Sequence, residues 1–172
     1  SENYAAAGKS SAEVTSTSAG YATLSYNGIT AEKNTDYILS FLLYIESAGE
    51  KDFRYSVLSG TKYVDSVKNI TVSGNTGEWI TVTKEFNSGA YTDLTLQLCP
   101  YGSGVYYIDS VYMGKRIDNP VYISAAAENG GYIYGAEAGI PYAAGSEVTV
   151  SAYPFAGYGF EGWFSGDECI ST

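Results

Sequence analysis

The chain has 172 residues and a formal net charge of -10, with nine basic residues against nineteen acidic ones. Binding to phosphates needs clustered Lys and Arg, so this balance argues against nucleic acid and against anionic membrane surfaces as partners. No apolar run approaches the ~20 residues that a membrane helix needs, so no membrane insertion is expected. Apolar residues make up 45% of the chain and charged residues 16%, which indicates a folded protein.

The composition favours strands over helices. The chain contains 18 Tyr and 20 Gly but one Met and no His. Tyrosine suits a pleated, half-buried surface and glycine suits turns. The predicted fold class is therefore all-β.

The most regular segment covers residues 36–47, DYILSFLLYIES. Its odd positions place Tyr37, Leu39, Phe41, Leu43 and Ile45 on one face of a predicted strand. Tyr44 lies on the opposite face. Polar residues at 48–51 predict a turn, and the alternation resumes at 52–58 with Arg54 opposed to Phe53. These two segments are predicted to form a hairpin.

Further short strands are predicted at intervals of roughly ten residues, a spacing typical of a sandwich or barrel. They cover residues 14–15, 21–25, 69–73, 79–86, 93–99 and 105–113. The turns between the later strands are rich in Gly, Ser and Asn. About eight strands in total predict a jelly-roll β-sandwich.

A boundary is predicted near residue 118. All nine basic residues lie at or before Arg116, and the sequence becomes Gly-rich and Tyr-rich after Pro120. We therefore predict a sandwich over residues 1–118 and a small β-rich unit over 119–172.

The first unit resembles carbohydrate-binding modules of families 4, 9 and 22, jelly rolls that accompany bacterial glycoside hydrolases. The matching segments are GKSSAEV at 8–14, NTDYILSFLLYI at 34–45, GEWITVTKEFN at 77–87 and DLTLQLCPYGSGVYYIDSVYM at 93–113. The chain departs from these families in lacking their opening Asn-Gly-x-Phe-Glu strand. The resemblance therefore supports less firmly any site that uses the Glu of that strand.

The second unit resembles extracellular repeats of bacterial surface proteins, including internalin-type B repeats. The matching segments are ENGGYIYG at 128–135 and AAGSEVTVSAYPFAGYGFEGWFSGDECIST at 143–172. Such repeats normally continue with further strands, so the natural protein is expected to extend past Thr172 and to be a longer multidomain protein.

Sugar recognition needs flat aromatic faces for stacking and planar hydrogen-bonding groups for the hydroxyls. In the resembling families the ligand lies in a groove on one sheet. The alternation of side chains along the predicted strands places Tyr44, Arg54 and Gln97 on such a surface. Tyr101, in the following loop, is predicted to form its wall. The alternative is that Tyr44 only shields the core and Arg54 is simply solvated.

Neither tryptophan is expected to contact ligand. The resemblance places Trp79 at a position that packs structurally in the family. Trp163 is the last residue of a GY-x-F-x-GW pattern in the second unit and is predicted to fill a small core with Tyr158 and Phe160.

Asp109 matches a family position that often binds a structural calcium ion, together with backbone carbonyls near Gly8 to Ser10. Calcium prefers six to eight oxygen ligands, so one carboxylate with several carbonyls can suffice. The alternative role for Asp109 is to accept backbone N–H bonds in a turn.

Catalysis is not expected. The chain has no His, and neither Cys99 nor Cys169 lies in a metal, redox or nucleophile motif. Glu46, Glu50 and Asp52 are carboxylates that a glycosidase could use, but they cluster at a predicted turn. Together with this, the two resemblances imply a non-catalytic, extracellular bacterial module that binds polysaccharide, such as plant cell-wall β-glycan. The alternative is a structural spacer or adhesion domain of a cell-surface protein.

Overall fold

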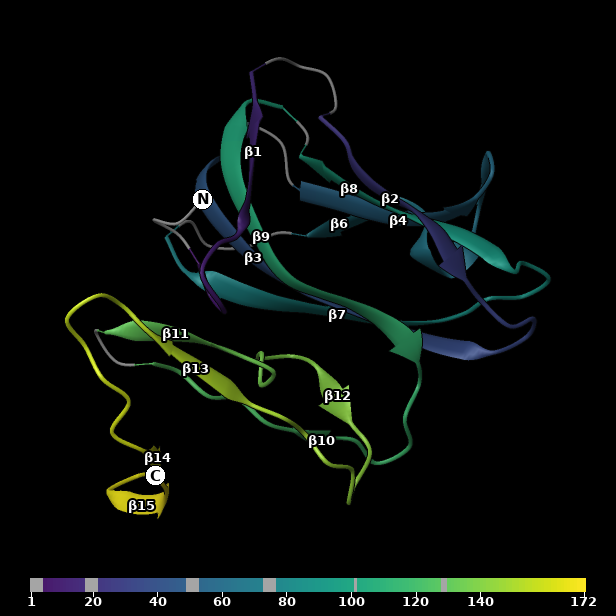
Figure 1. Ribbon diagram of the computed structural model, residues 1–172. Helices are drawn as coiled ribbons and strands as arrows, with labels where there is room; N and C mark the ends of the chain where they lie inside the picture. The colour runs from purple at the N-terminus through teal and green to yellow at the C-terminus, as the bar shows by residue number, and fades with distance from the viewer. Residues whose placement is uncertain (1–4, 18–21, 49–52, 73–76, 101, 128–129) are drawn as a thin grey trace.

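The computed structural model describes residues 5–17, 22–48, 53–72, 77–100, 102–127 and 130–172 (Figure 1). Across these ranges the regular structure is strand, apart from one 3-10 turn, η1 (Asp65–Val67). The predicted all-β class is confirmed. In the part of the chain that the structure describes, no helix is long and apolar enough to cross a membrane.

Two antiparallel sheets form the sandwich. Sheet I contains β1 (Ala12–Ser16), β9 (Gly104–Lys115), β3 (Asp36–Ala48) and β7 (Trp79–Asn87), in that order. Sheet II contains β2 (Leu24–Thr30), β8 (Asp93–Pro100), β4 (Phe53–Ser59) and β5 (Lys62–Tyr63), and β6 (Ile70–Val72) also pairs with β4. The chain passes to the other sheet after β1, β2, β3, β6, β7 and β8, which is the jelly-roll connectivity.

The predicted hairpin between β3 and β4 is wrong. β3 pairs with β7 and β9 in sheet I, whereas β4 pairs with β8, β5 and β6 in sheet II. Alternation reveals that one face of each strand is buried, but it does not reveal which strand lies beside which. In a jelly roll, successive strands contribute to opposite sides of the same core.

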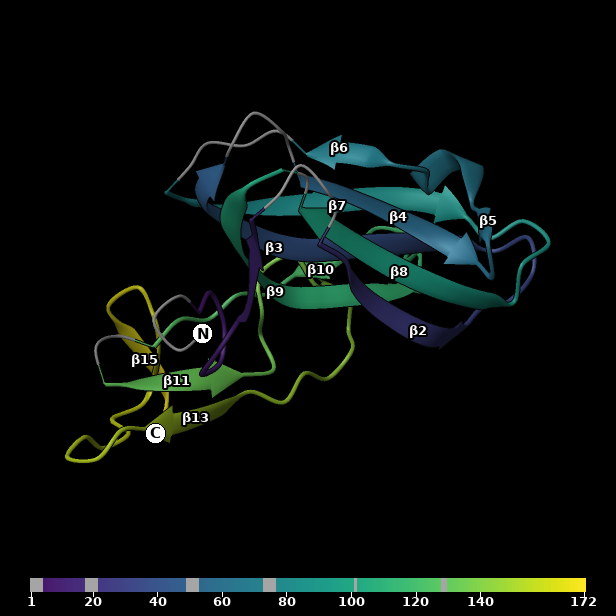
Figure 2. The ribbon, with the colours of Figure 1, turned by 90° about the horizontal axis from the view of Figure 1, so that it is seen from above.

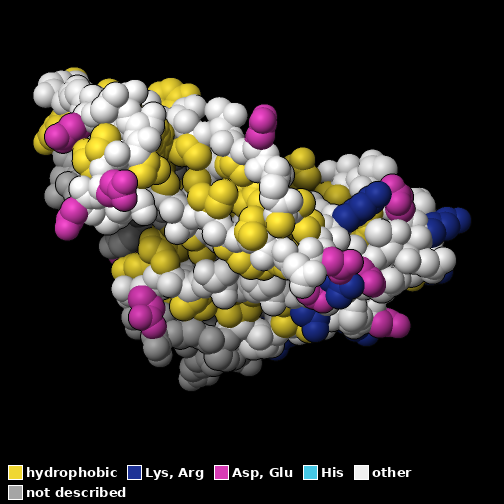
Figure 3. Space-filling view, turned by 90° about the horizontal axis from the view of Figure 1, so that it is seen from below, with side chains coloured by type: hydrophobic (Ala, Val, Ile, Leu, Met, Phe, Trp, Pro, Cys, Tyr) yellow, Lys and Arg dark blue, Asp and Glu magenta, His cyan; other side chains and the backbone are white. Residues whose placement is uncertain are grey.

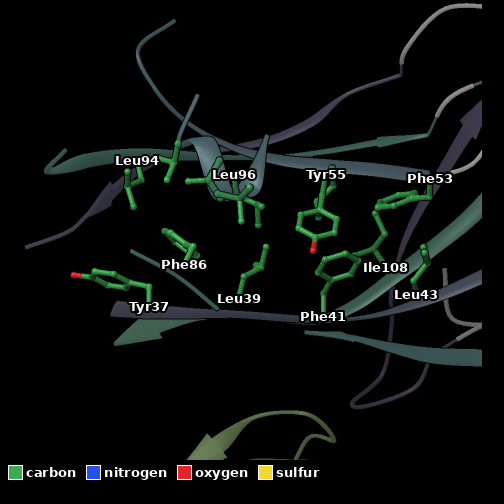
Figure 4. Packing of buried hydrophobic residues seen from close by; sticks show 14 of the residues in the cluster. Tyr37, Leu39, Phe41, Leu43, Phe53, Tyr55, Phe86, Leu94, Leu96 and Ile108 are labelled. Atoms are coloured by element: carbon green, nitrogen blue, oxygen red, sulfur yellow. The ribbon is translucent and has the colours of Figure 1, made fainter. Parts of the chain in front are cut away.

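The core lies between the two sheets (Figure 4). Leu39, Phe41 and Leu43 of β3 point toward Phe53 and Tyr55 of β4, and the three β3 side chains are fully buried. The Phe41 ring lies 6.0 Å from that of Phe53 and 5.5 Å from that of Tyr55, measured between centroids. Each such burial stabilises the fold by ~1.5–3 kcal/mol.

The C-terminal unit consists of three small antiparallel ladders. These are β10 (Val121–Tyr122) with β12 (Pro141–Tyr142), β11 (Gly131–Tyr134) with β13 (Ser151–Pro154), and β14 (Trp163–Ser165) with β15 (Glu168–Ser171). Phe160 contacts Trp163 at 5.5 Å between ring centroids, as the predicted small core requires. Tyr158, however, is 61% exposed, so the three rings do not form a closed core.

The C-terminal unit packs on the outer face of sheet I (Figures 1 and 2). A Cβ built on Gly139 would lie 3.0 Å from Ser40 Oγ and 3.1 Å from Thr81 Cγ2. Ser40 is 1% exposed and Leu42 5% exposed, although both point away from the sandwich core. The N-terminal segment adds a second connection, because Gly8 donates its backbone N–H to Ile133 O at 3.1 Å.

Candidate functional site

Three aromatic side chains form a row across the outer face of sheet I. Tyr44 of β3 is paired with Trp79 of β7 on one side and with Tyr107 of β9 on the other. The ring centroids of Tyr44 and Trp79 are 5.5 Å apart, and those of Tyr44 and Tyr107 are 6.0 Å apart. We call Trp79, Tyr44 and Tyr107 the aromatic row. Tyr44 and Trp79 are partly exposed, so the row presents aromatic surface on this side of the sheet.

The row is oriented by a polar contact at its buried end. Tyr107 is 5% exposed and donates its hydroxyl to Glu46 Oε2 at 3.0 Å. Glu46, named above as a glycosidase carboxylate, therefore accepts a hydrogen bond from this aromatic side chain. Glu50 and Asp52 lie outside the described residues.

A cleft adjoins the aromatic row where β7 faces the C-terminal unit. Its volume is about 320 Å³. Its lining residues are Thr81, Thr83, Tyr122, Ile123, Ser124, Ala138 and Gly139. We call it the β7 cleft. Sites for small ligands commonly have volumes of ~300–1,000 Å³, so this cleft is large enough for part of a sugar chain.

The β7 cleft and the aromatic row share the outer face of one strand. Trp79, Thr81 and Thr83 alternate with Ile80 and Val82, which pack against the core, so the first three share the outer face. Successive side chains on one face of a strand are ~7 Å apart. A ligand lying along β7 would therefore meet Trp79 first and the two threonines next.

The chemistry of the cleft is polar but uncharged. Thr81, Thr83 and Ser124 carry hydroxyls that both donate and accept hydrogen bonds. Tyr122, which is 57% exposed, contributes an aromatic ring. Figure 3 shows the molecule from this side, with hydrophobic side chains spread over the face, Asp and Glu side chains at several places on it, and the Lys and Arg side chains toward one end.

The predicted common face of Tyr44, Arg54 and Gln97 is wrong. Tyr44 lies on sheet I, whereas Arg54 of β4 and Gln97 of β8 lie on the outer face of sheet II. All three side chains do point outward, but outward on one sheet is opposite to outward on the other. Tyr101 lies outside the described residues. That any of the four contacts a ligand stays a prediction.

The predicted packing of Trp79 in the core is also wrong. Trp79 lies on the outer face beside Tyr44 and is absent from the hydrophobic cluster that Ile80 and Val82 adjoin. The alternation Trp-Ile-Thr-Val-Thr contained the signal, since it places Trp79 with the threonines. Nothing local indicated Tyr122 or Ser124, because packing between the two units brings them to the cleft.

Asp109 accepts three backbone hydrogen bonds. Its Oδ2 accepts from Ala6 N at 2.8 Å and from Ala7 N at 3.0 Å, and its Oδ1 accepts from Ser110 N at 2.7 Å. Calcium takes six to eight oxygen ligands, whereas the contacts found here turn backbone N–H groups toward both carboxylate oxygens. The arrangement fits the alternative role of accepting backbone N–H bonds, and the calcium ion stays a prediction.

Other acidic and thiol side chains offer no further metal centre in the described part of the chain. No group of three or more His, Cys, Asp or Glu side chains suited to a metal ion occurs within those ranges. The structure therefore adds no second candidate to Asp109.

A second groove lies between β2 and the C-terminal half of β9. Its volume is about 670 Å³. Leu24, Tyr26 and Val111 are its exposed apolar residues, and Leu96 and Leu98 form its base. It offers fewer hydroxyl groups than the β7 cleft, so it is a weaker candidate for sugar recognition.

Comparisons with known proteins support both predicted units. Residues 121–172 match the family model described as "Divergent InlB B-repeat domain", which confirms the predicted resemblance of the C-terminal unit. No curated protein matches the chain.

The sandwich is similar to solved sugar-binding domains. "Family 16 Carbohydrate Binding Module-2" superposes with a TM-score of 0.51 at 14% identity, covering 66% of this chain and 82% of that one. The sugar-binding "EclA C-terminal domain" gives 0.43 at 11% identity, covering 61% and 77%. The CBM6 of LamC from Zobellia galactanivorans gives 0.34 at 19% identity, covering 51% and 72%. The first of these shares the fold of the sandwich, which is of the carbohydrate-binding-module type. In this chain a B-repeat-like unit follows the sandwich.

Proposed function

We propose that this chain is a non-catalytic polysaccharide-binding module of a longer, extracellular bacterial protein. The observation that carries the proposal is the aromatic row of Trp79, Tyr44 and Tyr107 beside the hydroxyl-lined β7 cleft. The name of the similar family 16 module and the match to a B-repeat family support it. The ligand is proposed to be a β-glycan of plant cell-wall type or a similar polymer.

Binding follows from the chemistry of a pyranose ring. One face of the ring presents C–H groups, which stack on an aromatic side chain such as Trp79. Its rim presents hydroxyls, which exchange hydrogen bonds with Thr81 and Thr83. An open groove buries little of each sugar and must also order the chain, so the affinity of a short oligosaccharide is expected to be modest.

The test is affinity electrophoresis of the chain in gels containing cellulose derivatives, xylan, mannan, β-glucan or pectin. Trp79→Ala should weaken retardation about tenfold, the equivalent of ~1.4 kcal/mol for a lost stacking contact. Tyr158→Ala is the matched control, because Tyr158 is 61% exposed but lies outside the aromatic row, the β7 cleft and the second groove. If no polysaccharide of the panel retards the unmodified chain, the proposal is wrong.

The proposal that the module is non-catalytic rests on its side chains. The chain has no His, and Glu46 is engaged by the Tyr107 hydroxyl. Prolonged incubation with each retained polysaccharide should release no reducing ends. Release of reducing ends that Glu46→Gln abolished would assign a hydrolytic activity instead.

A structural spacer or adhesion domain is the second candidate function. The match of residues 121–172 to a B-repeat family favours it, since the predicted resemblance is to repeats of bacterial surface proteins. The Trp79→Ala variant separates the two functions. It should weaken glycan binding if the chain is a binding module, whereas a spacer has no glycan binding to lose.

A further inference from the structure

We infer that the C-terminal unit supplies one wall of the sugar site, and that the composite site selects neutral over acidic polysaccharides. Tyr122 and Ser124 then contact the same glycan that stacks on Trp79. This inference rests on the proposed function and deepens it, since it assigns part of the site to the B-repeat-like unit.

The two walls of the β7 cleft come from different units. Thr81 and Thr83 belong to the edge strand of sheet I, and Tyr122 to Ser124 belong to β10 and the residue pair after it. β10 is held in place by β12, with Tyr122 paired to Pro141. A ligand in the cleft therefore touches the sandwich on one side and the repeat unit on the other.

Packing between the units fixes the distance between these walls. The Ala138–Gly139 turn is pressed against Ser40 and Thr81, where no side chain larger than hydrogen fits without a shift. Gly139 has φ +83°, a conformation that glycine adopts without strain. At the N-terminal segment, Gly8 donates its backbone N–H to the carbonyl of Ile133. Asp109 in turn accepts backbone N–H bonds from Ala6 and Ala7. The cleft is thus preformed rather than assembled by the ligand.

The charges around the site set the class of glycan. No charged side chain lines the cleft among the residues described, and residues 117–172 contain no Lys or Arg at all. With a net charge of -10, the chain repels a polyanion and offers no cation at the cleft to pair with uronate carboxylates. Neutral xylan, mannan or β-glucan should bind, and polygalacturonate should not.

The wall from the repeat unit is tested on the full chain with three alanine variants. Tyr122→Ala and Ser124→Ala change that wall, and Tyr158→Ala is the control because Tyr158 is an exposed tyrosine of the same unit outside the cleft. We expect Tyr122→Ala to weaken binding to the retained neutral glycan about tenfold, and Ser124→Ala several-fold. Tyr158→Ala should bind as the unmodified chain does. A melting curve for each variant checks that it is folded.

The outcomes separate the inference from the proposed function. If the unmodified chain binds and Trp79→Ala binds weakly, but Tyr122→Ala and Ser124→Ala both bind normally, the repeat unit supplies no wall and the inference fails alone. If the unmodified chain binds nothing, the proposed function and the inference fail together. Retention by polygalacturonate as strong as by a neutral glycan would overturn the assignment of ligand class.

Discussion

Gly139 of the C-terminal unit lies so close to Ser40 of β3 that a Cβ on the glycine would come within 3.0 Å of the serine Oγ. This contact joins the two units at the base of the β7 cleft. It also explains why Ser40, an outward-pointing residue, is 1% exposed.

Gly139→Ala should loosen this junction. The φ of +83° costs an alanine ~1–2 kcal/mol wherever it occurs, and the new methyl group also displaces Ser40 or Thr81. Gly145→Ala is the matched control, since Gly145 has φ +82° but a Cβ added there would meet no atom within 4 Å. Thermal melting should show a larger fall for Gly139→Ala, with weaker glycan binding only in that variant. Equal falls for both variants would mean that the contact with the sandwich contributes nothing.

Phe41→Ala tests the core between the two sheets. Phe41 is fully buried against Phe53 and Tyr55, so truncation should lower the free energy of unfolding by ~3–5 kcal/mol, measured by denaturant titration. Ile170→Ala, at a side chain that is 64% exposed, should stay within about 0.5 kcal/mol of the unmodified chain. A small effect at Phe41 would contradict the packing of β3 against β4.

Asp109→Ala should destabilise the chain through its N-terminal segment. Loss of an acceptor for three backbone N–H groups is expected to cost ~1–2 kcal/mol, visible as a lower melting temperature. Glu161→Ala, at an exposed carboxylate, is the control and should melt as the unmodified chain does. An Asp109→Ala variant with an unchanged melting temperature would contradict the capping role.

The calcium ion predicted at Asp109 is decided by the same melting measurement. An ion present at a concentration one hundred times its Kd stabilises the folded state by about 2.7 kcal/mol. This corresponds to a rise in melting temperature of about 10 °C. If Asp109 only accepts backbone N–H bonds, the melting curve should be the same in chelator and in calcium. A calcium-dependent shift that Asp109→Ala abolishes would establish the ion.

The two thiols should differ sharply in reactivity. Cys169 is exposed, whereas Cys99 is buried and donates a hydrogen bond from Sγ to Thr23 Oγ1 at 3.7 Å. Burial raises the pKa of the Cys99 thiol, and the contact with Thr23 only partly offsets this. A raised pKa lowers the reactive thiolate fraction at any pH below it. Titration with a thiol reagent at pH 8 should label one thiol quickly and the second only on unfolding; equal rates would contradict the burial of Cys99.

Most of the fold was predictable from the sequence, because alternation in a strand directly reports a buried face. Alternate residues from Tyr37 to Ile45 lie in the core as the alternation predicts. The predicted strands match β3, β4, β7, β8 and β9 within a few residues. Which strands pair with each other was harder to predict from the sequence. The short polar segment after β3 suggested a hairpin, but the chain crosses to the other sheet.

The candidate site was only partly predictable for the same reason. The alternation of side chains along a strand is enough to place Tyr44 on an outer face. It does not tell the two sheets apart, and for this reason it wrongly groups Arg54 and Gln97 with Tyr44. Tyr122 and Ser124 could not be found from local sequence. They reach the β7 cleft through the packing of one unit on the other, which depends on contacts such as that of Gly139 with Ser40.

The most direct test of a sugar site at the aromatic row is the fluorescence of Trp79 during titration with a retained neutral glycan. The chain has two tryptophans, so Trp163→Phe leaves Trp79 as the single reporter. Stacking of a sugar removes water from the indole, so its emission should shift and saturate at the glycan concentration that saturates binding by electrophoresis. Saturated binding with unchanged Trp79 emission would place the glycan elsewhere and contradict the site.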